Sequence, residues 1–112
     1  MARVSQGEWV SGNVFIRPNT LEAVGDVVEG HTHHFDHTTI VFRGAIHVKA
    51  KLPTGAVIER DFHAPSHCLI KAEVMHEITA LEPNTEFWCV YSHRTPQGTI
   101  SEERTGWDAA YV

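Results

Sequence analysis

Three closely spaced histidines mark the stretch GDVVEGHTHHFDHTTIVFRG, which runs from Gly25 to Gly44. His31 and His33 are separated by one residue, and His37 follows four residues later. Side chains alternate between the two faces of a β-strand, so a strand here would direct all three imidazoles to one side. Imidazole is the commonest side-chain ligand of metal ions in proteins. The spacing therefore predicts a metal site carried on a strand.

A fourth histidine, His76, opens a second segment with the pattern of a strand. It follows a turn-like sequence at 71–73 and begins an alternation in which His76, Ile78 and Ala80 share one face. An adjacent strand could therefore complete the ligand shell. The predicted metal ligands are His31, His33, His37 and His76.

Short clusters of turn-forming residues divide the chain, and few intervals between them could hold a helix of three turns. The intervening segments are rich in β-branched and aromatic residues, which favour strands. In 45–52, apolar residues at even positions alternate with His47, Lys49 and Lys51, as expected of a strand with one wet face. An all-β sandwich or barrel is predicted. The expected strands are 14–16, 38–42, 45–49, 56–62, 67–70, 77–81 and 86–91.

The stretch from Gly25 to Gly44 resembles the first motif of the cupin superfamily, G-x5-H-x-H-x3,4-E-x6-G. Gly25, His31, His33 and Gly44 match the motif, and His37 stands where the family has glutamate. The second motif, G-x5-P-x-G-x2-H-x3-N, is matched at its histidine.

The other positions of the second motif differ. Pro65, Lys71, Glu73 and Ala80 stand in the places of its first glycine, proline, second glycine and asparagine. The resemblance implies a small double-stranded β-helix, the cupin jelly-roll barrel, as a single domain over 1–112. Its first motif lies at 25–44, its second at 65–80, and a tail follows at 96–112.

The chemistry of the four histidines indicates a transition metal. Imidazole suits Fe(II), Ni(II), Cu(II), Zn(II) and, less strongly, Mn(II), whereas Ca²⁺ and Mg²⁺ prefer oxygen. We expect one divalent ion per chain, with Fe as the first candidate and Mn, Ni, Zn or Cu as alternatives. Neutral ligands leave the charge of the ion uncompensated, so the site should favour anions. His37 could instead hydrogen-bond a ligand or a bound water.

Other residues carry weaker signals. Cys89, Tyr91 and His93 alternate along the last long segment, and Tyr91 and His93 are candidates for proton transfer if they face inward. Arg43 and Arg94 could hold a substrate carboxylate, although each is by default a surface residue. Four histidines are interpreted as ordinary polar residues: His34, His47, His63 and His67.

Composition narrows the class of protein. The 112 residues carry a formal charge of −5, which provides no basic field for nucleic acid. No apolar run could span a membrane and the start lacks a signal-peptide pattern, so a cytoplasmic location is expected. Cys68 and Cys89 are predicted to be reduced, buried thiols. A homodimer is expected, and its interface could include Trp9, Trp107 and Tyr111.

The leading functional hypothesis is a metal-dependent oxidoreductase, a dioxygenase acting on a small organic anion that chelates the metal. It depends mainly on the resemblance of an all-histidine site to diketone- and thiol-cleaving cupins. The first alternative is an isomerase or lyase that uses the ion as a Lewis acid. The second is a non-catalytic binding or sensor module, since one fold supports many functions.

Overall fold

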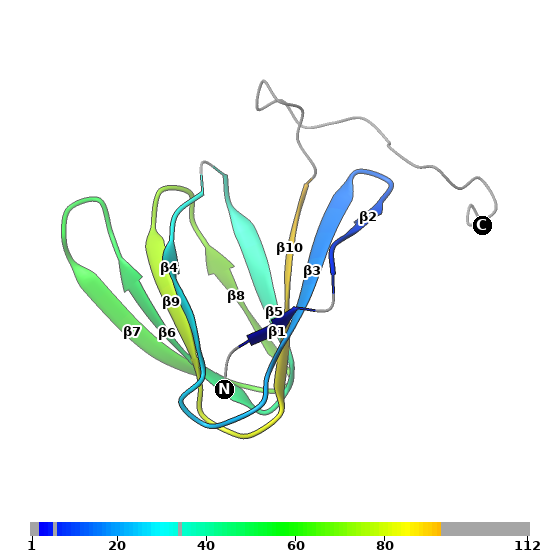
Figure 1. The fold of residues 1–112 in the computed structure, drawn as a ribbon. Helices are drawn as coiled ribbons and strands as arrows, with labels where there is room; N and C mark the ends of the chain where they lie inside the picture. Colours follow the sequence, from blue (N-terminus) through cyan, green and yellow to red (C-terminus); the bar gives the residue numbers. More distant parts are fainter. Residues whose placement is uncertain (1–2, 6, 34, 93–112) are drawn as a thin grey trace.

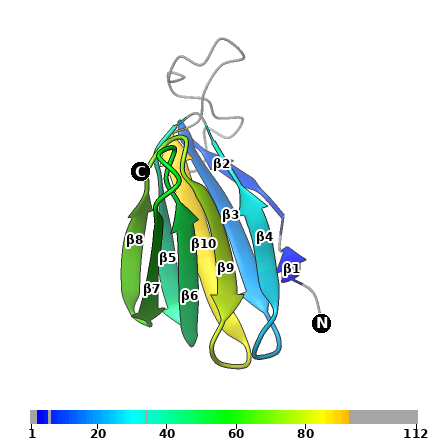
Figure 2. The same ribbon diagram turned by 90° about the vertical axis from the view of Figure 1, so that its left-hand side faces the viewer.

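The structure is a computed structural model that describes residues 3–5, 7–33 and 35–92. Two antiparallel sheets face each other across a common core (Figures 1 and 2). The first sheet, in spatial order, contains β1 (Arg3–Ser5), β3 (Val14–Leu21), β10 (Thr85–Ser92), β5 (His37–Arg43) and β8 (Ser66–Ile70), with β2 (Trp9–Ser11) also paired to β3. The second contains β4 (Val27–His31), β9 (Met75–Ala80), β6 (Ala45–Lys51) and β7 (Val57–His63).

The predicted all-β jelly-roll class is confirmed. All the expected strands are present, several of them longer than predicted. The two strands that precede β3 were not predicted, because segments of three residues are too short to show an alternation. The described residues include no helix suited to crossing a lipid bilayer.

Alternation along β6 and β9 fixes which side chains enter the space between the sheets. On β6, Ile46 and Val48 are buried whereas Lys49 and Lys51 are exposed. On β9, the residues at the parity of His76 are all buried. Both alternations match the sequence prediction, and the second one puts an imidazole in the same row as core residues.

The core joins the two sheets through apolar side chains that are almost fully buried. Leu21, Val41 and Phe87 from the first sheet pack with Ile46 and Ile78 from the second. Burial of such a side chain stabilises a fold by roughly 1.5–3 kcal/mol relative to its exposed state. The core therefore supplies a rigid scaffold for the strand ends.

Gly44 connects β5 to β6 at a point where no other residue fits well. Its φ is +75°, and a Cβ atom there would overlap the Thr85 hydroxyl and lie 3.0 Å from Thr85 Cα. That hydroxyl donates a hydrogen bond to the Glu82 carbonyl at 2.8 Å and accepts one from the Ala45 N–H at 3.3 Å. The glycine that ends the first cupin-like motif is thus required by packing as well as by backbone conformation.

Glu73 adopts the conformation of the glycine that it replaces in the second motif. Its φ is +67°, in the left-handed region that glycine favours. The turn before β9 therefore keeps the path that a glycine would give, at a cost of roughly 1–2 kcal/mol of backbone strain.

Both cysteines are free thiols, as predicted. Cys68 is buried and Cys89 is half-buried, and each pairs in register with Thr39 from opposite sides. The strand that carries Thr39 lies between the two cysteines, so they are two strand spacings apart. That distance is roughly 10 Å, which is too far for a disulfide. Trp9 is exposed, while Trp107, Tyr111 and the tail 96–112 lie outside the described residues.

Candidate metal centre

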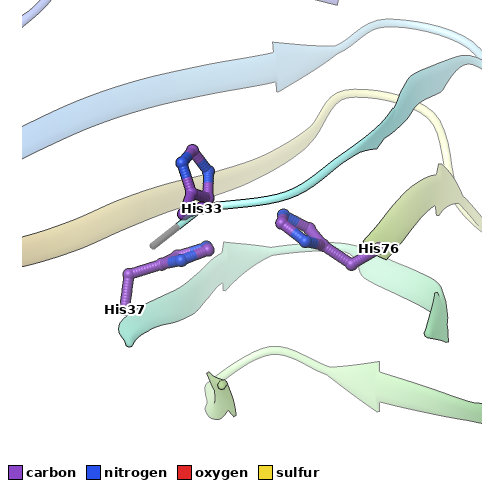
Figure 3. A group of neighbouring side chains, drawn as sticks. All are labelled: His33, His37 and His76. Carbon is purple, nitrogen blue, oxygen red and sulfur yellow. The ribbon is translucent and has the colours of Figure 1, made fainter. Parts of the chain in front are cut away.

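Three imidazole rings lie close together (Figure 3), where β4 ends and where β5 and β9 begin. His33, His37 and His76 each offer a nitrogen, and these atoms all lie within 4.8 Å of one another. The ring centroids are separated by 5.0 Å, 5.2 Å and 5.7 Å. This is the only such cluster of potential metal ligands in the part of the chain that the structure describes.

Three different parts of the fold deliver these side chains. His37 is the first residue of β5, and His76 is the second residue of β9. His33 lies beyond the end of β4, which stops at His31. Two strand starts and one strand end therefore meet at the same end of the molecule.

The prediction that a single strand carries His31 and His33 is wrong for His33. The His33 carbonyl accepts a hydrogen bond from the Glu73 N–H at 2.8 Å. This bond joins the segment after β4 to the turn before β9, so the backbone has already left the sheet at His33. For His33, the contact between the two loops brings the ring to the others, whereas His37 and His76 lie in the buried rows of their strands.

Asp36 ties these loops together a second time. Its Oδ1 accepts a hydrogen bond from the Ala72 N–H at 2.7 Å, and its Oδ2 lies 3.3 Å from Lys71 Nζ. A carboxylate that accepts from a backbone N–H makes a stronger bond than two neutral groups do. Asp36 thus holds the segment between His33 and His37 against the turn that precedes His76.

Hydrogen bonding sets the tautomer of His76. Its Nδ1 lies 3.2 Å from the Val74 carbonyl, which can only accept, so Nδ1 carries the proton. The lone pair is then on Nε2, the form in which a neutral imidazole binds a metal. His76 is 1% exposed and His37 is 4% exposed, so both rings are fixed by packing.

A cavity of about 30 Å³ adjoins the three rings. That volume exceeds the roughly 10–15 Å³ that a cavity needs to hold one water. Tyr91 contributes to its wall and is held between Phe15 and Phe35, with ring centroids 4.6 Å and 4.4 Å away. The tyrosine ring therefore has a defined position beside the cluster.

Strand β3 adds Arg17 and Asn19 to the cavity wall. Arg17 Nη2 lies 3.0 Å from Glu8 Oε2, and its guanidinium carbon lies 5.7 Å from the centre of the Phe15 ring. Asn19 is 1% exposed and donates from Nδ2 to the Arg17 carbonyl at 3.0 Å. No hydrogen-bond partner among the described residues reaches Asn19 Oδ1. The wall thus offers one cation and one buried acceptor.

The cluster has the composition of a site for a divalent transition metal. Its donors are imidazole nitrogens, one tautomer is set by a backbone carbonyl, and two rings are buried. Within the described residues no carboxylate joins the cluster, which disfavours Ca²⁺ and Mg²⁺. His33, His37 and His76 are positioned to bind such an ion.

The fourth predicted ligand, His31, is in register with His76, but its side chain lies outside the described residues. His34, His93 and Arg94 also lie outside them. His63, His67 and Arg43 are exposed, and none of them lines the cavity. His47 is an outward-facing residue that contacts two carboxylates, in keeping with its interpretation as an ordinary polar residue.

The sequence interpretation missed Arg17 and Asn19. Both lie at the same strand parity as Leu21, which is fully buried. The sequence signal that could have identified them is therefore the presence of two polar residues at inward-facing positions of β3. A polar residue at a core position needs a partner or a function. That alternation indicates where a ligand-facing wall lies.

A jelly roll with a buried cluster of imidazoles between the ends of its sheets defines a class of small β-barrels equipped to hold a metal ion. The fold is that of the cupin superfamily, which confirms the resemblance seen in the sequence.

Solved structures with this fold include a variant of oxalate decarboxylase OxdC from Bacillus subtilis. It aligns with a TM-score of 0.67 and 21% identity over 75% of this chain and 22% of that one. Another structure of this decarboxylase, whose description names Mn(II) centres, has a TM-score of 0.67 and 22% identity over 82% of this chain and 23% of that one. The chain thus spans about a quarter of the decarboxylase or less.

A cupin superfamily protein from Desulfitobacterium hafniense is closer in size. Its TM-score is 0.67 with 14% identity, over 81% of this chain and 77% of that one. No protein-family model and no curated protein sequence matches the chain. At these identities, the similarity establishes the fold alone.

Proposed function

We propose that the chain is a metal-dependent enzyme that acts on a small organic anion. One divalent transition-metal ion would be held by His33, His37 and His76, with His31 as a fourth ligand. The observation that carries the proposal is the convergence of three imidazoles whose ligand atoms lie within 4.8 Å of one another. A bound ion would supply Lewis acidity and, for Fe or Mn, access to redox chemistry.

Charge supports an anionic substrate. The three imidazoles are neutral ligands, so they would not cancel the charge of a divalent ion. Arg17 adds a positive charge to the cavity wall, and its contact with Glu8 uses Nη2 alone of the guanidinium nitrogens. A guanidinium has five N–H donors, so donors remain for a carboxylate.

Two further residues suit the handling of a proton. Asn19 Oδ1 is a buried acceptor, which would take a hydrogen bond from a hydroxyl group, a protonated carboxyl group or a water. The phenol of Tyr91 is fixed on the same wall by its aromatic neighbours. Tyr91 thus remains a candidate for proton transfer, and His93 remains one from the sequence alone.

A Lewis-acid lyase reaction is one candidate class. The cavity is small, about 30 Å³, which favours a ligand of few atoms. The similarity in fold to oxalate decarboxylase gives this class a precedent, although the shared identity is low.

Oxygen-dependent cleavage by a dioxygenase is the second class. It is favoured by the absence of a carboxylate from the described cluster, because His37 stands where the cupin motif has glutamate. Fe is the metal expected for this reaction, and the Mn(II) centres of the decarboxylase make Mn the matching choice for the lyase.

The test is reconstitution of the metal-free protein with Fe(II), Mn(II), Ni(II), Cu(II) or Zn(II) in separate samples. Each sample is assayed for oxygen uptake and for release of carbon dioxide with small carboxylates, diketones, thiols and catechols. His33→Ala should remove both the bound metal and the turnover. His67→Ala is the matched control, because His67 is an exposed histidine outside the cluster.

Dependence on oxygen separates the two reaction classes. Turnover that stops under anaerobic conditions supports the dioxygenase, and turnover that persists supports the lyase. Tight ligand binding without turnover for any metal would contradict both classes and favour a sensor module. Full metal content in His33→Ala would contradict the site itself.

A further inference from the structure

A second cavity, which the metal site does not use, lies between the sheets beside β7 and β8. Its volume is about 200 Å³, and it shares no lining residue with the histidine cavity. Its walls are mainly apolar side chains of β6, β7 and β8. The lining includes Val48, Ala50, Ile58, Phe62, Cys68 and Ile70.

Sheet topology explains why a cavity forms there. β7 ends the second sheet and β8 ends the first, so no ladder of backbone hydrogen bonds closes this side of the sandwich (Figure 1). Side chains alone fill the space between the two strands. Apolar cavities of roughly 150 Å³ in proteins are large enough to bind benzene.

Arg60 breaks an otherwise apolar row that faces this cavity. On β7, Ile58, Arg60 and Phe62 have the same parity and pair in register with Ala50, Val48 and Ile46. Arg60 lines the cavity and is also exposed, and an arginine in such a place can cover apolar surface with its stem while its guanidinium reaches water.

Lys71 provides a second cation on the same wall. It lies just after β8, lines the cavity, and contacts Asp36 through an exposed ion pair of 3.3 Å. Exposed pairs of this kind are weak. The lining of this apolar cavity thus carries two positive charges, although the chain as a whole has a formal charge of −5.

We propose that this cavity binds a small carboxylic acid with a compact apolar body, such as a single aromatic ring. The apolar body would occupy the space between the sheets, and the carboxylate would meet Arg60, with Lys71 beside it. Arginine suits this role because its planar fork matches a carboxylate in a bidentate arrangement.

The one titratable group deep in the cavity wall would not oppose an anion. Burial raises the pKa of the Cys68 thiol to about 11, so it stays neutral at physiological pH. A neutral thiol behaves as a small apolar group. Arg60 and Lys71 are therefore the charged residues of the lining.

Benzoate and the uncharged benzyl alcohol are the probes, titrated into the full chain while side-chain methyl resonances are followed by NMR. The metal-free His33→Ala variant is used, so that a carboxylate cannot bind at a metal. Arg60→Gln should weaken benzoate binding by about tenfold and leave benzyl alcohol binding unchanged. Ala50→Leu, which fills the cavity, should weaken binding of both probes. Arg43→Gln, at an exposed arginine outside the cavity, should change neither.

Binding in the His33→Ala variant would stand even if the proposed metal function failed. The proposal is overturned if benzoate shifts no resonance of the cavity residues, or if Ala50→Leu leaves both affinities unchanged. It is also overturned if Arg60→Gln alters only solubility or oligomeric state. Arg60 would then protect an open strand edge or contact a second copy of the chain.

Discussion

The Glu73 N–H donates a hydrogen bond to the His33 carbonyl at 2.8 Å, which joins the loop after β4 to the turn before β9. The relative position of His33 and His76 thus depends on a contact between the segments that precede or carry them. Asp36 reinforces the link through the Ala72 N–H at 2.7 Å. Positioning of the metal site should therefore be sensitive to residues that do not touch the metal.

Asp36→Ala should weaken metal binding by about tenfold to a hundredfold, because the loop between His33 and His37 loses its anchor. Isothermal titration with Mn(II) or Zn(II) measures the effect. Lys71→Ala is the matched control, since it removes only the exposed ion pair to Asp36 and should change the affinity little. Equal metal affinities in Asp36→Ala and the wild type would show that the loop holds its position by other contacts.

His37→Glu should raise the affinity for a divalent metal and lower the affinity for small anions, each by about tenfold. The carboxylate would cancel part of the charge that neutral imidazoles leave on the ion. Competitive metal titration measures the first effect, and titration of the loaded protein with oxalate measures the second.

Because His37 is 4% exposed, His37→Gln serves as a second variant with a neutral side chain. His37→Gln should lower the affinity for the metal, because it removes the imidazole without adding the negative charge of a carboxylate. If neither variant changed metal or anion binding, His37 would not be a ligand.

Gly44→Ala should lower the free energy of unfolding by about 2–4 kcal/mol, measured by urea denaturation. The added methyl group would overlap Thr85 and force a side chain into a positive φ. Gly25→Ala is the control that separates these causes, because Gly25 also has a positive φ but a Cβ there meets nothing within 4 Å. It should lose only about 1 kcal/mol. Equal losses in the two variants would show that backbone strain alone accounts for Gly44.

The strands and the inward-facing histidine of β9 could be predicted from the sequence because they follow from alternation alone. The buried row that contains His76 and Ile78 is visible as a period of two, and so is the exposed row of Lys49 and Lys51. Gly44 could also be identified, because its spacing from the histidines matches a known motif.

The approach of His33 to His37 and His76 could be anticipated only in outline. It depends on a hydrogen bond from Glu73 and on the contact of Asp36 with Ala72, and no period in the sequence encodes contacts between loops. Glu73 also takes a left-handed conformation that its residue type does not suggest.

His47 should contribute a pH-dependent increment to stability. Its Nδ1 lies 2.6 Å from Asp61 Oδ1 and its Nε2 lies 2.9 Å from Glu59 Oε1, so both nitrogens face carboxylates across β6 and β7. Hydrogen bonds to Asp61 and then Glu59 raise the pKa of His47 above its ordinary 6.5. Because the folded-state pKa is raised, the stabilisation is complete below the unfolded pKa and disappears as the pH rises through the folded pKa.

His47→Gln should therefore lower the free energy of unfolding by about 0.5–1 kcal/mol at about pH 5.5 and by much less at about pH 9. The increment is small because both carboxylates are more than half exposed. Urea denaturation at the two pH values measures the difference, and NMR titration of the His47 ring gives its pKa directly. His63→Gln is the control. His63 is an exposed histidine on β7, two residues beyond Asp61, and pairs in register with Ala45. A His47 pKa at or below 6.5, or a loss of stability that is the same at both pH values, would show that the two contacts do not hold a charged imidazole.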